Sequence, residues 1–297
     1  MKRDTDKSYD FQPGDQQEER PRRVQRRKKP GKWLGLALTV LVVLGVVAAA
    51  VLWDANSFDG LRRSIIYARA EKDETGCARL YHYENDATSR FAVLNGSLVT
   101  VAANQLRVLD ERSQVLYQTG VRFSSPDLVS GGDVAVAYDI GGTVLYALDS
   151  KGLRWEWETE GELIAVTVNP HGYVTATYNK NGVKAAVTVW DSKGEEVFTF
   201  HSSQRFVMTA ALSRDSRTLA AVTMGQQDGA FQSFLVLYRL NSEEPVATTT
   251  VNGGVVYQLA AMQRDFCLVT EEGLYMVSDS GEQRASYSYG GQFVRRC

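Results

Sequence analysis

A unit of about 40 residues that recurs from residue 79 onward constrains the fold of this chain more than any other feature. In each unit a short run of β-branched and small apolar residues ends at an Asp or an Asn, and these residues are Asp110, Asp149, Asp191, Asn241 and Asp279. The successive intervals are 39, 42, 50 and 38 residues. Such runs, bounded by turn signals, predict strands. A period near 40 residues with about four strands per unit is typical of a β-propeller blade.

The Asp or Asn at the end of each run predicts a tight turn between two strands. A short side chain of this kind hydrogen-bonds the backbone ahead of it, and a following Gly takes a positive φ, as expected for Gly152, Gly194 and Gly281. Calcium binding is the alternative role for these acids. Because each Asp stands alone in its turn, whereas a calcium site needs several convergent oxygens, we expect turns and no metal.

The repeat divides the chain into five predicted blades, and the predicted fold class is an all-β propeller. The expected blades are residues 88–119, 124–158, 161–200, 205–250 and 254–287. Beyond them, 290–296 has the pattern of the inner strand of a further, incomplete blade. The strand-like segment Cys77–Tyr83 could join it in a composite sixth blade, or the chain could lack a blade or more. We favour the second alternative, in which the end sheets expose unpaired edges.

An uncharged run of nineteen residues, Leu34 to Leu52, lies between Trp33 and Trp53. At ~1.5 Å per residue, a helix over 33–53 is about 30 Å long, which is the thickness of the hydrocarbon core of a bilayer. The two tryptophans fit the two headgroup belts. A cleaved signal peptide is the alternative, since the run contains three consecutive alanines at 48–50. The length of the run and of the tail before it favours an uncleaved transmembrane anchor.

The tail at 1–32 is basic, with eleven Lys/Arg against six Asp/Glu, and we expect it to be disordered. Arg26, Arg27, Lys28 and Lys29 precede the span directly, which predicts a cytoplasmic amino terminus. We expect these cations to contact the lipid bilayer and not nucleic acid, because no aromatic residues are interleaved with them. The predicted location is the cell membrane, crossed once, with the carboxyl domain outside.

Residues 54–76 connect the span to the β region. Phe58, Leu61, Ile65 and Ala68 recur at intervals of three and four, which predicts a short amphipathic helix. The β-propeller is then expected at 77–297.

The residues able to perform chemistry are few and scattered. His82, His171 and His201 lie at no metal-ligand spacing, and Cys77, Cys267 and Cys297 form no paired motif. We expect free thiols, with Cys77 and Cys297 as the pair to test if a disulfide exists. No nucleophile elbow, P-loop or Rossmann motif is present. Trp155 and Trp157 are better explained by blade packing than by a cofactor shelf, so we expect no cofactor, no metal and no catalytic residues.

The segment from Ser213 to Val222, Ser-Arg-Asp-Ser-Arg-Thr-Leu-Ala-Ala-Val, is similar to the S-P-D-G-x-x-L-A entry to a blade strand in WD40-like and TolB-like propellers. Arg214 replaces the Pro and Ser216 the Gly. A looser copy begins at Asn169. The layout of residues 20–297, with Ser-Phe-Asp-Gly-Leu-Arg-Arg at 57–63, resembles an uncharacterised family of membrane-anchored propeller proteins of Gram-positive bacteria. The resemblance implies a longer carboxyl end and transfers no functional residue.

Taken with the predicted topology, the fold favours a non-catalytic extracytoplasmic module that binds an envelope protein or a cell-wall polymer. A transmembrane signalling component that uses its cytoplasmic tail is the first alternative, and an envelope enzyme is the second.

Overall fold

The computed structural model describes residues 39–43, 88–227 and 229–292. The chain divides into two compact units, Met1–Ile65 and Ile66–Cys297, and the twenty described strands belong to the second. Residues 39–43, inside the predicted span, are helical. In the described part of the chain, no helix is both long and apolar enough to cross a membrane. The predictions for the tail 1–32, for the basic cluster 26–29, for Trp33 and Trp53 and for the connector 54–76 concern residues outside the described ranges.

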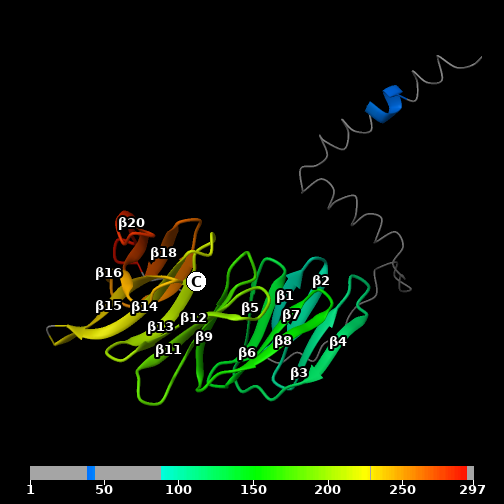
Figure 1. Cartoon of the computed structure of the whole chain (residues 1–297), viewed down its shortest axis with the longest axis horizontal. Coiled ribbons are helices and arrows are strands. Elements are labelled where there is room, and N and C mark those ends of the chain that lie inside the picture. The colour runs from blue at the N-terminus through cyan, green and yellow to red at the C-terminus, as the bar shows by residue number, and fades with distance from the viewer. Residues whose placement is uncertain (1–38, 44–87, 228, 293–297) are drawn as a thin grey trace, which may run out of the picture. The chain divides into compact units, whose positions relative to one another are not determined.

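Twenty strands form five antiparallel sheets, and in each sheet four strands follow one another in chain order (Figure 1). Blade 1 contains β1 (Arg90–Leu94), β2 (Ser97–Val101), β3 (Gln105–Leu109) and β4 (Val115–Gly120). Blade 2 contains β5 (Pro126–Gly131), β6 (Val134–Asp139), β7 (Val144–Asp149) and β8 (Gly152–Glu158). Blade 3 contains β9 (Leu163–Val168), β10 (Val174–Tyr178), β11 (Ala185–Trp190) and β12 (Glu196–Ser202).

The last two sheets include the longest strands. Blade 4 contains β13 (Phe206–Leu212), β14 (Thr218–Gln227), β15 (Ala230–Arg239) and β16 (Pro245–Val251). Blade 5 contains β17 (Val256–Ala261), β18 (Asp265–Thr270), β19 (Gly273–Ser278) and β20 (Gln283–Ser288). The five predicted blades are confirmed, because each predicted range agrees with one sheet to within two residues at either end.

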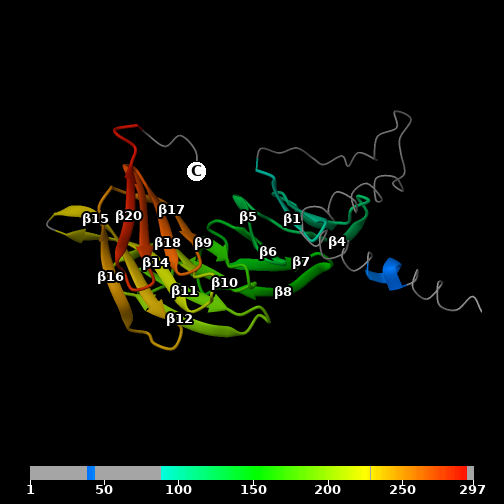
Figure 2. The ribbon, with the colours of Figure 1, turned by 90° about the horizontal axis from the view of Figure 1, so that it is seen from above.

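The first strand of each blade contacts the first strand of the next, in the order β1, β5, β9, β13 and β17 (Figure 2). The fourth strands lie on the outside, and β20 is exposed along its whole length. Turns between the first and second strands and between the third and fourth strands lie at one end of the blades, which we name the lower end. Turns between the second and third strands and the connections between blades lie at the opposite, upper end.

Neighbouring blades are held together by four apolar clusters, one at each interface between consecutive blades. Blades 1 and 2 share the cluster that contains Val99, Val108 and Leu148. The other three clusters lie between blades 2 and 3, 3 and 4, and 4 and 5. Burial of one large aliphatic side chain in such a cluster contributes about 1.5–3 kcal/mol. Apolar contact between the facing sides of neighbouring sheets therefore holds the blades together.

The burial of the second strands distinguishes the middle blades from the end blades. In β10 every residue is buried, as expected for a sheet covered on both faces, whereas in β2 and β18 buried and partly exposed residues alternate. Blade 5 therefore has one face without a neighbouring sheet among the described residues. We name it the blade 5 end face, and it carries the partly exposed Cys267, Val269, Leu274 and Met276.

The predicted inner strand of a further, incomplete blade, 290–296, does not begin within the described residues 290–292. Gly290 and Gly291 form a turn, with φ values of +62° and +83°, so no strand begins at Gly290. The remainder of that predicted strand, 293–297, and its predicted partner Cys77–Tyr83 lie outside the described ranges.

Candidate functional site

The acids that the repeat singled out lie in turns at the lower end of the blades. The Oδ1 atom of Asp110 accepts hydrogen bonds from the backbone N–H groups of Arg112 and Gln114, both at 2.8 Å. Asp191 accepts from Lys193 at 2.8 Å and from Glu195 at 3.0 Å in the same way. Asp149 accepts from Lys151 at 2.7 Å and from Gly152 at 3.1 Å. Each carboxylate thus satisfies backbone donors of its own turn.

The turns of blades 4 and 5 differ from this pattern. In blade 5 the acceptor is the hydroxyl oxygen of Ser278, which receives the N–H groups of Ser280 at 3.4 Å and Glu282 at 3.1 Å. Asp279 is one residue further on, and its Oδ2 lies 3.5 Å from Nη2 of Arg239 in blade 4. In blade 4, the backbone N–H of Ser242 bonds to the carbonyl oxygen of Arg239 at 3.0 Å, and Asn241 is exposed.

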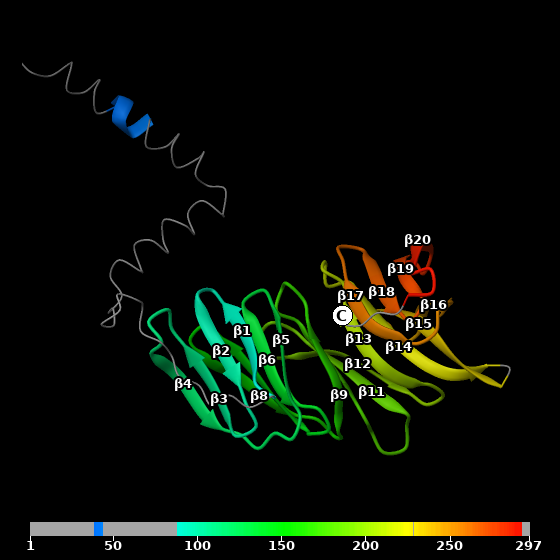
Figure 3. The same cartoon turned by 180° about the vertical axis from the view of Figure 1, so that it is seen from behind.

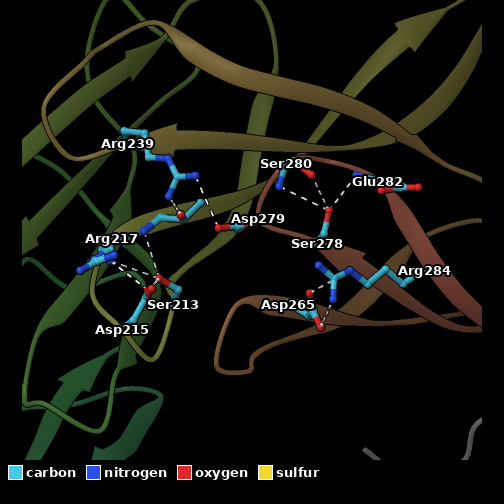
Figure 4. A network of polar contacts seen from close by, with 11 residues as sticks. Ser213, Asp215, Arg217, Arg239, Asp265, Ser278, Asp279, Ser280, Glu282 and Arg284 are labelled. Atoms are coloured by element: carbon cyan, nitrogen blue, oxygen red, sulfur yellow. Dashed lines mark hydrogen bonds and ion pairs between the residues drawn. The ribbon is translucent and has the colours of Figure 1, made fainter.

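A network of polar side chains joins the lower ends of blades 4 and 5 (Figure 4). Arg239 donates to the hydroxyl of Thr218 and pairs with Asp279. Within blade 5, Nε of Arg284 lies 3.4 Å from Oδ1 of Asp265. Because the side chains of the two ion pairs are partly exposed, we assign the pairs an orienting role and little net stabilisation.

The Ser213–Thr218 turn completes this network. The Ser213 hydroxyl donates to Asp215 at 2.7 Å and accepts from the backbone N–H of Thr218 at 3.0 Å. Ser216 occupies the position of the consensus Gly and has a φ of +57°. Its hydroxyl accepts from Nδ2 of the buried Asn169, in blade 3, at 2.7 Å. These polar groups therefore connect turns to one another.

A wide pocket of about 610 Å³ also opens at the lower end. Its lining includes the turn residues Met262, Gln263 and Arg264 together with Arg214 and Met276. Since Met276 belongs to the blade 5 end face, this pocket adjoins the uncovered side of blade 5.

A second concave site lies at the upper end, beside the hairpin formed by β14 and β15. Each of these strands has ten residues, and the hairpin projects beyond its sheet (Figures 1 and 3). The adjoining pocket has a volume of about 350 Å³. We name it the hairpin groove. It is lined by Met224, Phe231, Gln232, Ser233, Asn252, Gly253, Gly254, Val255 and Glu271.

Phe231 and Glu271 give the hairpin groove its chemical character. The Phe231 side chain is 75% exposed, the highest value among the large apolar residues of the described chain. The Oε2 atom of Glu271 accepts the backbone N–H of Val255 at 3.2 Å, and its Oε1 accepts the hydroxyl of Tyr257 at 3.2 Å. An exposed aromatic ring thus stands next to a carboxylate that is held in place by two donors.

The sequence prediction did not include the hairpin groove. Its signal is the interval of 50 residues between Asp191 and Asn241, against 38 to 42 for the other intervals. The additional residues lengthen β14 and β15 and so produce the projecting hairpin.

Comparison with protein families decides the classification of the chain. The model of a family of unknown function, DUF5711, matches residues 72–289. The chain belongs to the DUF5711 family. No curated protein matches it in sequence.

Solved structures resemble this DUF5711 chain in fold. A chain from the crystal structure of the mitotic checkpoint complex has a TM-score of 0.50 at 16% identity, over 71% of each chain. The β-propeller domain of Cps50 (Swd1) from Myceliophteria thermophila has a TM-score of 0.50 at 11% identity, over 71% of this chain and 74% of that one. These likenesses show a β-propeller fold of the WD40 type and nothing about activity.

A weaker likeness is to Kuenenia stuttgartiensis hydrazine synthase, with a TM-score of 0.48 and 13% identity. The match includes 65% of the DUF5711 chain and 63% of the synthase chain, less than two thirds of the length of that protein.

Of the remaining predicted residues of the DUF5711 chain, His201 and Cys267 line neither pocket, although Cys267 pairs across the strands with Met276 of the lower pocket. His201 Nε2 lies 3.0 Å from Nζ of Lys180, which pairs with Glu160 at 2.6 Å. The hydrogen bond from Lys180 lowers the pKa of Glu160. Cys267 is a free thiol, and burial raises its pKa. His82, Cys77 and Cys297 lie outside the described ranges. Among the described residues, no group of three or more His, Cys, Asp or Glu side chains could hold a metal ion.

Trp155 and Trp157 lie at the interface between blades 2 and 3. The rings of Trp157 and Trp190 are stacked with their centroids 4.6 Å apart, and Trp157 Nε1 donates to the carbonyl of Gly194 at 3.2 Å. Their placement is that of blade packing.

Proposed function

We propose that this protein is a non-catalytic binding platform of the cell envelope, anchored by residues 33–53 and binding its partner at the hairpin groove. The projecting β14–β15 hairpin, with Phe231 exposed beside a concave site, is the observation that carries this proposal. A large aromatic residue that is exposed next to a pocket is the usual kind of anchor for a protein partner.

The polar residues of the lower end support a platform over an enzyme. Asp110, Asp149 and Asp191 are engaged by backbone donors of their own turns. Arg239 and Asp279 engage one another. Side chains that are used in this way hold the loops rigid, and a rigid frame with one projecting hairpin is suited to recognition.

The envelope location rests on the sequence. The uncharged run at 34–52 and the basic cluster before it support a single span with the amino terminus inside. With this orientation, the five blades and the hairpin groove face the outside of the cell. The partner is then another envelope protein or a cell-wall polymer.

The experiment is proximity labelling in the native cell from a peroxidase fused to the carboxyl end of the full-length chain. Phe231→Asp is compared with Val246→Asp, a matched control on the outer strand of the same blade whose side chain is 49% exposed. We expect Phe231→Asp to reduce labelling of at least one envelope protein, or co-sedimentation with isolated cell walls, about tenfold. Val246→Asp is expected to leave both unchanged. Equal labelling and equal co-sedimentation for wild type and both variants would refute the proposal.

A further inference from the structure

The tip of the hairpin extends beyond both strands that flank it. Pairing of β13 with β14 ends at Met224, and β16 pairs with β15 only from Ser233 onward. Gln226 and Gln227 pair with Phe231 and Ala230 across the hairpin. In the described part of the chain, these tip residues have no other strand partner. The outer edge of β15 is therefore open at Phe231.

The geometry of the turn identifies the backbone groups that face outward. Two residues, at 228 and 229, connect the strands, and Gly229 has a φ of +82°. In a hairpin with a two-residue loop, the closing pair exchanges both hydrogen bonds and the next pair exchanges none. Gln227 and Ala230 are the closing pair, so the N–H and C=O of Phe231 point away from β14.

The pairing further along β15 agrees with this alternation. Ser233 lies two residues beyond Phe231, so its backbone groups point to the same side, and it is the residue that pairs with Val251 of β16. The side chain of Gln232 donates to the carbonyl of Val251 at 2.7 Å, which closes the end of β16. A strand placed next to Phe231 would therefore continue the line of β16.

In such an added strand, the side chain of the residue paired with Phe231 would lie on the same face of the sheet as the Phe231 side chain. Residues that are paired across two strands have their side chains on the same face of the sheet. Met224, Phe231 and Ser233 share this face, and they line the hairpin groove. The side chain of the added strand would thus enter the groove.

The negative charge of the hairpin groove favours a positively charged side chain on the added strand. Glu271 lines the groove, and Glu272 follows it in the β18–β19 turn. In the described part of the chain, neither carboxylate forms an ion pair. Each oxygen of Glu271 accepts one hydrogen bond and keeps a further lone pair. A Lys or Arg fits this site, because its aliphatic stem packs on Phe231 and Met224 while its charge reaches Glu271.

We propose that the open edge of β15 at Phe231 binds an extended segment of a partner protein as an added strand, with a Lys or Arg opposite Phe231 in the hairpin groove. Main-chain hydrogen bonds supply affinity in this mode of recognition, and the pocket supplies specificity. The inference rests on the proposed function and narrows its partner to a protein segment.

The test uses random twelve-residue peptides displayed on phage and selected on the full-length chain in lipid nanodiscs. Selected peptides are synthesised and their affinities are measured for wild type and for three variants. Phe231→Ser tests the apolar contact of the groove, and Glu271→Gln tests the charge. Glu244→Gln, in the exposed β15–β16 turn at the lower end, is the matched control.

We expect selected peptides to contain Lys or Arg within β-forming residues. Phe231→Ser and Glu271→Gln are each expected to weaken their binding about tenfold, whereas Glu244→Gln leaves it unchanged. N-methylation of the peptide backbone is expected to abolish binding at alternate positions only, because every second N–H faces β15. Exchange of the Phe231 amide hydrogen is expected to slow about tenfold when peptide is bound.

The outcomes separate the two proposals. The added strand is refuted if the selected peptides need Phe231 but tolerate N-methylation at every position. It is also refuted if they need Phe231 but bind equally well to Glu271→Gln. In both cases the hairpin groove remains a binding site, and the proposed function stands. Selection that yields no peptide dependent on Phe231 overturns both the added strand and the hairpin groove as a site for protein segments.

Discussion

Trp157 in blade 2 donates its indole N–H to the carbonyl oxygen of Gly194 in blade 3, over 3.2 Å. The same relationship links blades 4 and 5, where the hydroxyl of Thr249 donates to the carbonyl of Gly281 at 2.7 Å. In both cases the glycine belongs to a turn between third and fourth strands, and the donor belongs to the fourth strand of the preceding blade. The turn glycine therefore has two roles, since it closes its own hairpin and contacts the neighbouring blade.

Replacing Gly194 tests these two roles separately. Gly194 has a φ of +90°, and a Cβ at this position would lie 3.0 Å from Cδ1 of Trp155. We expect Gly194→Ala to lower the free energy of unfolding by about 3 kcal/mol, from backbone strain and displacement of the ring. Gly182 is the matched control, because its φ is +86° and a Cβ added there would have nothing within 4 Å.

For Gly182→Ala we expect a loss of about 1 kcal/mol, which is the cost of the backbone conformation alone. The measurement is urea unfolding of the full-length protein in detergent micelles, followed by tryptophan fluorescence. Equal losses for the two variants would show that contact with blade 2 contributes nothing.

Asn169 and Asn241 both belong to turn segments, but we expect Asn169 to contribute more to stability. Oδ1 of Asn169 accepts the backbone N–H groups of His171 and Tyr173, both at 3.0 Å, and its Nδ2 donates to Ser216 in blade 4. Asn169 is 5% exposed and its partners are partly buried, so Asn169→Ala leaves several polar groups without partners and should cost about 2–3 kcal/mol. Asn241→Ala, at an exposed position, should cost less than about 0.5 kcal/mol. A ranking in the opposite order in urea unfolding would refute this interpretation of the turns.

The sequence predicted the five blades because each blade leaves a periodic trace. In each blade an apolar run ends at a polar turn, and the interval between two successive turns of this kind equals the length of one blade. The identity of the capping residue was less predictable. Ser278 accepts the turn hydrogen bonds that the pattern attributed to Asp279. A hydroxyl and a carboxylate both accept such bonds, so side-chain chemistry alone does not fix the position of a turn to one residue.

The hairpin groove could not be predicted for a different reason. It depends on the register of β14 and β15 relative to their flanking strands, and on the approach of Glu271 from the next blade. The longer interval in the fourth repeat indicates additional residues there. It does not indicate that Phe231 remains exposed or that a carboxylate lies nearby.

Two leucines of blade 5 test whether the blade 5 end face stays uncovered in solution. Leu268 is fully buried against blade 4, and Leu274, on the adjacent strand β19, is partly exposed on the opposite face. We expect Leu268→Ala to cost about 3 kcal/mol of unfolding free energy, because it leaves a cavity in a closed cluster. Leu274→Ala should cost about 1 kcal/mol or less. Similar losses in urea unfolding would mean that another element covers the end face.

Cys267 lies on the same end face and gives an independent measure of its environment. Burial raises the pKa of the Cys267 thiol, so the fold favours the neutral thiol, and at a given pH less thiolate is present than in an unfolded chain. In a variant with Cys77→Ser and Cys297→Ser, alkylation by iodoacetamide should reach half of its maximal rate at a higher pH in the folded protein than in urea. The urea sample is the control, since the thiol there has its ordinary pKa of about 8.5. A folded midpoint at or below the midpoint in urea would show that the Cys267 side of blade 5 is more open to water than its partial burial implies.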